Sequence, residues 1–253
     1  MKVQLLSDLH LEYSHKTLPK ISAEADVLVY AGDIAASKNN LYQYFNSIRK
    51  THKIPIVMIL GNHDYYNSYL NKAADKLKSA VEKLDDIHIL NRESIEIGDV
   101  TFVGTTLWTD FDRGRDEVAV MQVFPDYKKI YKVSSDYRKV KINTNDILKE
   151  HRKDVKWLRE TIQPDKKTVI VTHHVPTNSF IPECYKSSVL NGGFYVDMSD
   201  FMIDYEVDVW CCGHTHFFMD CEINDCRIFC NPWGYPFEDN SDGHYKEEFI
   251  FEV

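Results

Sequence analysis

Short apolar runs alternate with longer polar segments in the first third of the chain. The runs occupy residues 2–7, 26–31 and 54–60, and a helix-compatible segment at 39–52 separates the second run from the third. Runs that are apolar on both faces are typical of parallel strands in a sheet that is covered on both sides. The alternation therefore predicts βαβ units and an α/β fold.

The segment at residues 69–85 predicts an amphipathic helix. Its apolar side chains recur at helical spacing and are flanked by charged ones, which places them on one face of a helix. These apolar positions are Leu70, Ala73, Ala74, Leu77, Val81 and Leu84.

Strand-like runs return in the remainder of the chain and predict two sheets packed face to face, with helices outside. They lie at residues 87–90, 94–97, 100–104, 169–172, 207–212, 226–231 and 248–252. Residues 108–160 interrupt them with a charged, tyrosine-rich, helix-leaning stretch. We interpret this stretch as a lid-like insertion or helical pair within a single domain that spans residues 1–253.

The composition is that of a globular protein without a membrane segment. The apolar fraction is 43% and the aromatic fraction 13%, which argues against disorder, and no apolar run is long enough to cross a bilayer. The first strand-like run begins at residue 2 and leaves no room for a signal peptide, so we expect a cytoplasmic protein. The six cysteines match no common zinc spacing, which favours buried reduced thiols over a small structural metal site.

The net charge of −9 argues against nucleic acid as the main partner, because polyanion binders usually carry a basic surface. The charge is uneven, however. Residues 108–160 carry 13 Lys or Arg against 10 Asp or Glu, an excess of +3. This stretch could recruit an anionic substrate or form a solvated helical surface. Nothing in the sequence fixes the oligomeric state.

Five polar clusters follow apolar runs, at the places where strands end and loops begin. Loops at strand ends are where enclosed α/β proteins usually place their chemistry. The clusters are Asp8-Leu9-His10, Gly32-Asp33, Gly61-Asn62-His63-Asp64, Thr172-His173-His174 and Gly213-His214-Thr215-His216.

The residue types in these clusters suit divalent transition metals. Asp8 and His10 are two positions apart, so on an extended strand their side chains leave the same face, and His214 and His216 share this spacing. A carboxylate such as Asp33 can bridge two cations about 3.5–4 Å apart. Taken singly, Asp33 could be an ordinary turn residue, and residues 62–64 could cap a downstream helix. Five such clusters together make these alternatives improbable.

The order D-x-H, G-D, G-N-H-D, strand-end His and G-H-T-H resembles the calcineurin-like metallophosphoesterase superfamily. The resemblance implies a four-layer αββα sandwich of two mixed β-sheets flanked by helices, and two divalent transition-metal ions (manganese, iron, zinc, cobalt or nickel). It also implies that His63 contacts the phosphate or protonates the leaving oxygen and that Asp64 orients His63. The implied ligands are Asp8, His10, Asp33 and His216 for one ion and Asp33, Asn62, His173 and His214 for the other.

Two details of the site stay open in the sequence. Strand alternation directs only one of His173 and His174 toward the site, and we favour His173. Candidates for the substrate pocket are aromatic residues that could stack on a base and arginines that could hold a second anionic group. They are Trp108, Arg113, Arg115, Trp233 and Tyr235.

The expected activity is hydrolysis of a small phosphomonoester or phosphodiester by metal-activated water. Phosphoprotein phosphatases of the superfamily carry GDxVDRG, whereas this chain reads GDIAAS from Gly32 to Ser37, so protein phosphatase activity is not expected. The alternatives are a metal-dependent nuclease, which the acidic balance disfavours, and a non-catalytic scaffold, which has no chemical need for a complete ligand set.

Overall fold

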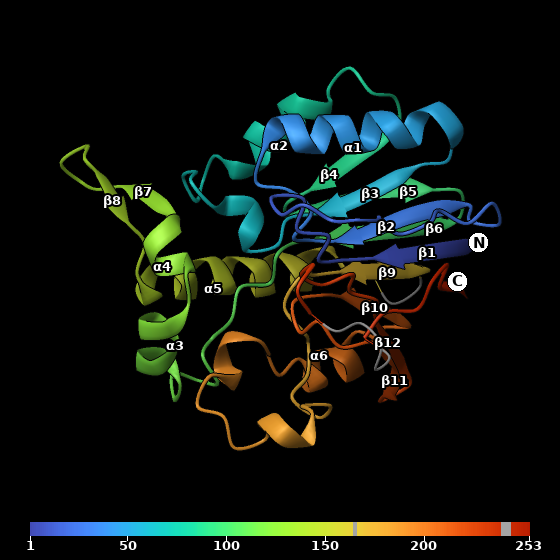
Figure 1. The fold of residues 1–253 in the computed structure, drawn as a ribbon. Coiled ribbons are helices and arrows are strands. Elements are labelled where there is room, and N and C mark those ends of the chain that lie inside the picture. Colours follow the sequence, from blue (N-terminus) through green and yellow to red (C-terminus); the bar gives the residue numbers. More distant parts are fainter. Residues whose placement is uncertain (164–165, 239–243) are drawn as a thin grey trace.

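The first of two large sheets contains the amino-terminal strands. A computed structural model of the protein describes residues 1–163, 166–238 and 244–253. The strand order is β13-β1-β2-β3-β4, parallel except for β13, which runs antiparallel to β1 (Figure 1). The bounds are β1 Lys2–Leu6, β2 Val27–Ala31, β3 Ile56–Ile59, β4 Ile87–Leu90 and β13 Ile250–Glu252.

The second sheet has the order β11-β12-β10-β9-β6-β5. Its four inner strands are parallel, and the two edge strands, β11 and β5, run antiparallel to their neighbours. The bounds are β5 Glu93–Ile97, β6 Val100–Gly104, β9 Thr168–Val171, β10 Val209–Cys212, β11 Met219–Ile223 and β12 Cys226–Cys230.

Helices cover the outer face of each sheet, so the predicted αββα sandwich is confirmed (Figure 1). Alternation along β2 shows how the layers are built: Val27 and Val29 face the second sheet in the central core, whereas Leu28 and Tyr30 pack with Phe45 of α1. The outer helices are α1 Lys38–Thr51 and α2 Ala73–Val81 on the first sheet, and α5 Thr144–Thr161 and α6 Ser199–Asp204 on the second.

The helix predicted at 69–85 is shorter in the structure. The backbone N–H of Leu70 donates to the carbonyl of Tyr131 at 2.8 Å, and Tyr69 forms a β-bridge with Tyr131. These contacts hold Tyr69 in a bridge, and residues 70–72 form a turn in which Lys72 N–H donates to Tyr69 O at 2.9 Å, so α2 begins only at Ala73. The expected apolar stripe is otherwise buried from Ala73 to Val81.

Residues 108–160 contain more than helices. They form α3 (Glu117–Val123), α4 (Asp126–Lys129), the hairpin of β7 (Tyr131–Val133) with β8 (Lys139–Lys141), and most of α5. Leu158 of α5 belongs to the core behind the second sheet, so α5 is one of the outer layers of the sandwich. The hairpin projects away from both sheets (Figure 1). A lid function of this stretch stays a prediction.

The cysteines lie mainly in the second sheet. Cys211, Cys212, Cys226 and Cys230 are buried free thiols, and Cys184 is exposed. No cluster of three metal-ligating residues within the described ranges includes a cysteine. No helix in those ranges is both long and apolar enough to span a membrane.

Candidate metal centre and active site

The five clusters converge because their strands end at the same edge of two packed sheets. β1, β2 and β3 are neighbours in the first sheet, and β9 and β10 are neighbours in the second. Backbone hydrogen bonds join the loops that follow: Asp8 N–H donates to Gly32 O at 3.0 Å, His10 N–H to Asp33 O at 2.9 Å, and Gly213 N–H to His173 O at 2.9 Å. Residues more than 200 positions apart are thereby held around one centre.

The backbone of this centre is strained. Five of the seven predicted ligands have the positive φ of the left-handed region, which costs a non-glycine residue roughly 1–2 kcal/mol. Such conformations persist where surrounding contacts enforce them, and here they belong to the side chains that meet at the centre. The five are Asp8, His10, Asp33, His214 and His216.

Gly61 permits the closest approach within the site. A Cβ atom at this position would lie 2.2 Å from Asp33 Oδ1 and 2.6 Å from His173 Cε1. Any side chain would displace the aspartate, which explains why a glycine precedes Asn62.

One group of donors consists of Asp8, His10 and His216. Their ligand atoms all lie within 4.8 Å of one another. The Nε2 atoms of His10 and His216 are 3.1 Å apart, and His216 Nε2 lies 3.5 Å from Asp8 Oδ1. Two imidazole nitrogens that face each other beside a buried carboxylate form a donor set suited to a transition metal.

A second group consists of Asp33, His173 and His214, within the same 4.8 Å limit. His173 Nε2 lies 3.0 Å from Asn62 Oδ1 and 3.4 Å from Asp33 Oδ2. The same Asp33 oxygen is 3.8 Å from His10 Nε2, so it lies between the two groups. All seven predicted ligands therefore meet around one centre.

Each of the four histidines has one ring nitrogen that faces the centre and one that does not. The second nitrogen lies within hydrogen-bond distance of an oxygen atom in all four cases. Histidine ligands usually have this arrangement, because an oxygen acceptor fixes the tautomer that leaves the other nitrogen free to bind metal. The pairs are His10 Nδ1 with Glu12 Oε1 (3.2 Å), His173 Nδ1 with Ala31 O (2.9 Å), His214 Nε2 with Gly193 O (3.2 Å) and His216 Nδ1 with Glu238 Oε2 (2.7 Å). The donor set thus fits bound cations.

The charges in the metal-free protein lead to the same conclusion. Burial opposes ionisation of Asp33, but the neighbouring His173 and His63 outweigh it and hold the pKa of its carboxyl well below the usual range. Burial also opposes charge on His216, yet Asp8 and Glu238 raise its pKa to about 10. Buried carboxylates that draw protons onto nearby imidazoles also attract metal cations.

His173 and His174 occupy different positions relative to the centre. His174 lies beside the centre, with Nδ1 3.3 Å from the carbonyl of Thr106 and its ring against Trp108. Burial and the adjacent His173 lower the pKa of His174 to about 3. His173 is therefore the histidine that faces Asn62 and Asp33.

Asp126 supports the centre and was not predicted. Its Oδ1 accepts hydrogen bonds from Asn62 Nδ2 at 2.9 Å and from the hydroxyl of Tyr66 at 2.7 Å. Because the amide nitrogen of Asn62 is engaged in this way, the amide oxygen points toward His173. Asp126 belongs to α4, so the 108–160 stretch helps to build the site.

The expected pairing of Asp64 with His63 is wrong. Asp64 instead accepts hydrogen bonds from the backbone N–H groups of Asp33 (2.8 Å), Ala35 (2.9 Å) and Gly61 (2.9 Å), which makes it a brace for two ligand loops. Burial and the nearby Asp33 raise the pKa of Asp64 to about 7. The side chain that contacts His63 is Glu12, whose Oε1 lies 2.8 Å from His63 Nδ1.

Comparison with known protein families agrees with this geometry. The family model "Calcineurin-like phosphoesterase" matches residues 1–218. The chain belongs to the calcineurin-like phosphoesterase family. It is therefore a hydrolase of phosphoric esters, and this family is metal-dependent.

One related sequence and one solved structure show how far the similarity extends. The chain is 27% identical to "Uncharacterized protein L509" of Acanthamoeba polyphaga mimivirus over 96% of this chain and 94% of that protein. The crystal structure of phosphopantetheinyl hydrolase (PptH) from Mycobacterium tuberculosis has the same fold, with a TM-score of 0.66 and 16% identity over 93% of this chain and 90% of that one.

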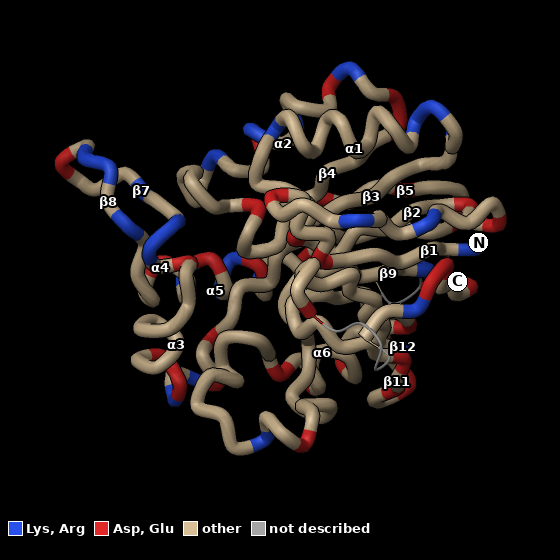
Figure 2. Tube along the Cα trace, in the orientation of Figure 1, with Lys and Arg blue, Asp and Glu red and all other residues tan. Residues whose placement is uncertain are grey.

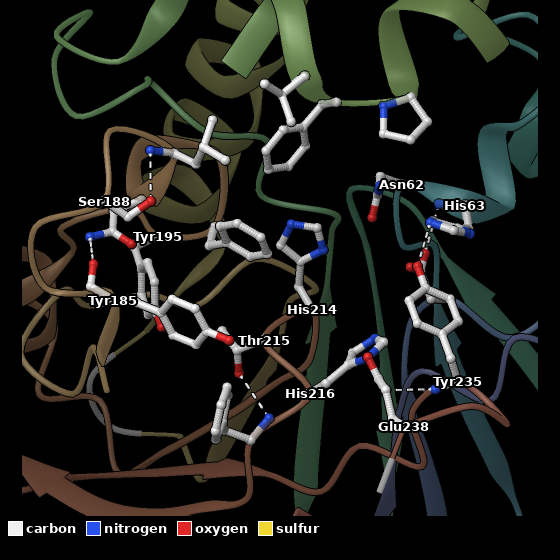
Figure 3. Close-up of a pocket in the computed structure, with 18 of the residues that line it drawn as sticks. Asn62, His63, Tyr185, Ser188, Tyr195, His214, Thr215, His216, Tyr235 and Glu238 are labelled. Atoms are coloured by element: carbon white, nitrogen blue, oxygen red, sulfur yellow. Dashed lines mark hydrogen bonds and ion pairs between the residues drawn. The ribbon is translucent and has the colours of Figure 1, made fainter. Parts of the chain in front are cut away.

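A cavity of about 750 Å³ opens beside the centre of this phosphoesterase. Asn62, His63 and Tyr235 lie on one side and Tyr185 and Tyr195 on the other (Figure 3). Much of the lining is aromatic, and it includes Phe124, Tyr185, Phe194, Tyr195 and Phe217. This volume accommodates a drug-sized ligand.

Of the five substrate-pocket candidates, only Tyr235 lines this cavity, with its hydroxyl 3.2 Å from His63 Nε2. Trp108 is buried, because its ring packs against Tyr65 and His174. Trp233 packs against Tyr245 and donates to His15 Nδ1 at 3.2 Å.

The two arginines line a separate hollow of about 330 Å³. Arg115 is held by Asp116 at 2.8 Å and Asp112 at 2.6 Å, and Arg113 lies 3.9 Å from Asp197. Carboxylates engage the guanidinium group of Arg115 and lie close to that of Arg113, and neither arginine lines the main cavity. A contact of either with substrate stays a prediction.

Proposed function

We propose that the protein hydrolyses a small phosphomonoester or phosphodiester with the help of two divalent transition-metal ions. The observation that carries the proposal is the position of Asp33 Oδ2, which lies 3.8 Å from His10 Nε2 and 3.4 Å from His173 Nε2. A carboxylate between two groups of donors can serve both cations of a two-metal hydrolase.

Each ion would have four protein ligands. Nitrogen and oxygen donors in this mixture suit manganese, iron, zinc, cobalt or nickel. When bound, such ions lower the pKa of a coordinated water and stabilise negative charge on the phosphoryl oxygens. The first ion would be held by Asp8, His10, Asp33 and His216, and the second by Asp33, Asn62, His173 and His214.

In this proposal, His63 donates a proton to the leaving oxygen. Burial opposes its protonation, but Asp33 and Glu12 outweigh burial and raise the pKa of His63 above its usual value. In the loaded enzyme the charge of Asp33 would be shared with cations, which leaves Glu12 to hold the proton on Nδ1. His63 Nε2 then faces the cavity beside the hydroxyl of Tyr235.

The size of the cavity favours a small organic phosphoester over a folded phosphoprotein. The structurally similar phosphopantetheinyl hydrolase is named for hydrolysis of an organic group of this kind, which supports the proposal at the level of fold. A non-catalytic scaffold is disfavoured, because such a protein has no chemical need for a complete ligand set or for the Glu12–His63 pair.

Metal analysis combined with kinetics tests the proposal. Protein purified without added metal should contain bound transition metal and should hydrolyse p-nitrophenyl phosphate or bis(p-nitrophenyl) phosphate. Asp33→Ala should abolish turnover and lower metal content, whereas His63→Gln should retain metal and lose most turnover, in the range of about 10²–10⁴-fold. Near-wild-type kinetics of Asp33→Ala would refute the shared carboxylate.

A further inference from the structure

The hairpin of β7 and β8, together with the end of α4, carries an unusual concentration of positive charge. Residues 128–141, which we call the basic hairpin, contain six Lys or Arg and one Asp, a net charge of +5 in a chain of −9. The remaining residues therefore carry −14. Lys and Arg positions follow one another along β7, β8 and the end of α4 (Figure 2).

Four lysines of the basic hairpin have no acidic partner. Lys132 is paired with Asp146 and Arg138 with Asp136. No described carboxylate lies within salt-bridge distance of the other four cations, and all four residues are exposed. They are Lys128, Lys129, Lys139 and Lys141.

Aromatic rings hold these cations together. The ammonium groups of Lys139 and Lys141 lie 3.7 Å and 3.6 Å from the centroid of the Tyr131 ring, so they cannot be more than about 7 Å apart. Tyr137, at the tip of the hairpin, is 89% exposed. Clustered lysines repel one another, and an anion placed between them would relieve this repulsion.

The basic hairpin is continuous with the catalytic cavity. Lys129 lines the cavity, and its ammonium group lies 4.6 Å from the centroid of the Tyr66 ring, which packs against His63 at 4.2 Å. α4 begins at Asp126, which holds Asn62, and β7 begins two residues after α4 ends. The ammonium group of Lys141 donates to the carbonyl of Lys128, the neighbour of Lys129, which links the lysines of the hairpin to the one that lines the cavity.

We propose that the basic hairpin binds the phosphate backbone of a short single-stranded nucleic acid whose end enters the catalytic cavity. The inference rests on the proposed function and narrows its substrate to the terminal ester of a strand. Exposed lysines would follow the backbone while Tyr137 offers a stacking face to a base, the combination that binds single strands without sequence preference. A cavity of about 750 Å³ has room for roughly one or two nucleotides, which suits the end of a strand.

Two observations favour this partner over other anionic macromolecules. The lysines adjoin a site that cleaves phosphoesters. A nucleic-acid strand carries both the anionic groups that lysines bind and phosphodiester bonds that this site could cleave, whereas an acidic protein has no such bonds and a membrane surface cannot enter the cavity. The residues outside the basic hairpin carry a net charge of −14, which disfavours a long duplex that would extend over them. The chain-wide charge thus restricts the length of the strand that binds.

Fluorescence anisotropy with a labelled phosphorothioate strand of about 12 nucleotides tests the inference, because the modified linkages allow binding to be measured on the metal-loaded protein with cleavage suppressed. Lys139→Glu/Lys141→Glu is the test variant. Lys50→Glu/Lys53→Glu, in the last turn of α1 and just beyond it, changes the charge equally and serves as the matched control. Melting temperatures establish that both variants fold.

The wild-type protein and the control should bind the strand equally. The hairpin variant should bind at least about tenfold more weakly, and its salt dependence should be shallower by roughly 1.4 in log–log slope, the value for two lost phosphate contacts on a single strand. Equal binding by the hairpin variant, absence of wild-type binding, or tighter binding to phosphatidylserine vesicles than to the strand would overturn the inference.

Hydrolysis of bis(p-nitrophenyl) phosphate by the wild-type protein separates this inference from the proposed function. Normal hydrolysis without strand binding defeats the inference alone. Strand binding without any hydrolysis of small esters defeats the proposed function and leaves the basic hairpin as a nucleic-acid-binding surface.

Discussion

Replacement of Asp126 tests whether a residue outside the ligand set controls one of the two predicted ions. The two ends of an asparagine amide are nearly the same shape, so Asn62 could present either oxygen or nitrogen to a cation. Asp126 decides between them, because its Oδ1 accepts from Asn62 Nδ2 at 2.9 Å and leaves Asn62 Oδ1 facing His173. In Asp126→Ala this preference is lost.

The expected size follows from these contacts. A hydrogen bond to a charged acceptor contributes roughly 1.5–3 kcal/mol, and Asp126 accepts two, from Asn62 and Tyr66. Groups that orient a metal ligand typically change metal affinity by about 10–100-fold. Burial raises the pKa of Asp126, so its ionised form is costly, and removing it partly offsets the lost hydrogen bonds. Metal affinity is therefore a clearer measure than thermal stability.

The assay is a competition titration of the metal-free protein with a chromophoric chelator, which resolves two binding constants. Asp126→Ala should weaken one ion about 10–100-fold and leave the other within a few-fold. Asp126→Asn is the matched control, because both hydrogen bonds run to Oδ1 and an asparagine oxygen can accept them. The reasoning is refuted if both ions weaken equally in Asp126→Ala or if neither does.

Two further replacements test the surroundings of the ligands. Glu12→Gln removes a negative charge that raises the pKa of His63. The alkaline limb of the kcat–pH profile, where protonated His63 is lost, should therefore move to lower pH. An unchanged alkaline limb would contradict the role of Glu12. Gly61→Ala would place a Cβ 2.2 Å from Asp33 Oδ1, so metal content should fall and turnover should drop by roughly 100-fold or more. Gly114→Ala is the control, because no atom lies within 4 Å of its Cβ. It should retain metal despite a backbone cost of about 1–2 kcal/mol.

The strands were predictable because each signal is local. Residues 26–31 read as a buried strand, and β2 spans Val27–Ala31. The edge strand β11, Met219–Ile223, was missed because it alternates buried and exposed positions rather than forming an apolar run. The β7–β8 hairpin was missed because each of its strands has only three residues, YKV and KVK, which is too short for their alternation to be recognised as a strand. Pairing with a neighbour, not composition, makes both segments strands.

The substrate-pocket residues were less predictable, because their fate depends on competing neighbours. Trp108 follows the end of β6 closely, which suggested an approach to the metals. The structure buries its ring against Tyr65 instead, and this removes more of its apolar surface from water than a position in the open cavity would. Arg113 and Arg115 lie beside the carboxylates of Asp197 and Asp116 and not in the main cavity. The sequence contains these acidic residues, but it does not state which of them are adjacent in space.

The metal ligands and their supports differ in predictability for a chemical reason. A cation accepts only certain donors, so the ligand positions require Asp, Asn or His and leave a pattern in the sequence. The atom behind each histidine need only be a hydrogen-bond acceptor. Glu12 and Glu238 fill two of these places, and the backbone carbonyls of Ala31 and Gly193 fill the other two. Every residue has a backbone carbonyl, so two of these four acceptors place no requirement on the side chain at their position. The sequence therefore does not reveal them, and a library of side-chain variants would fail to detect them.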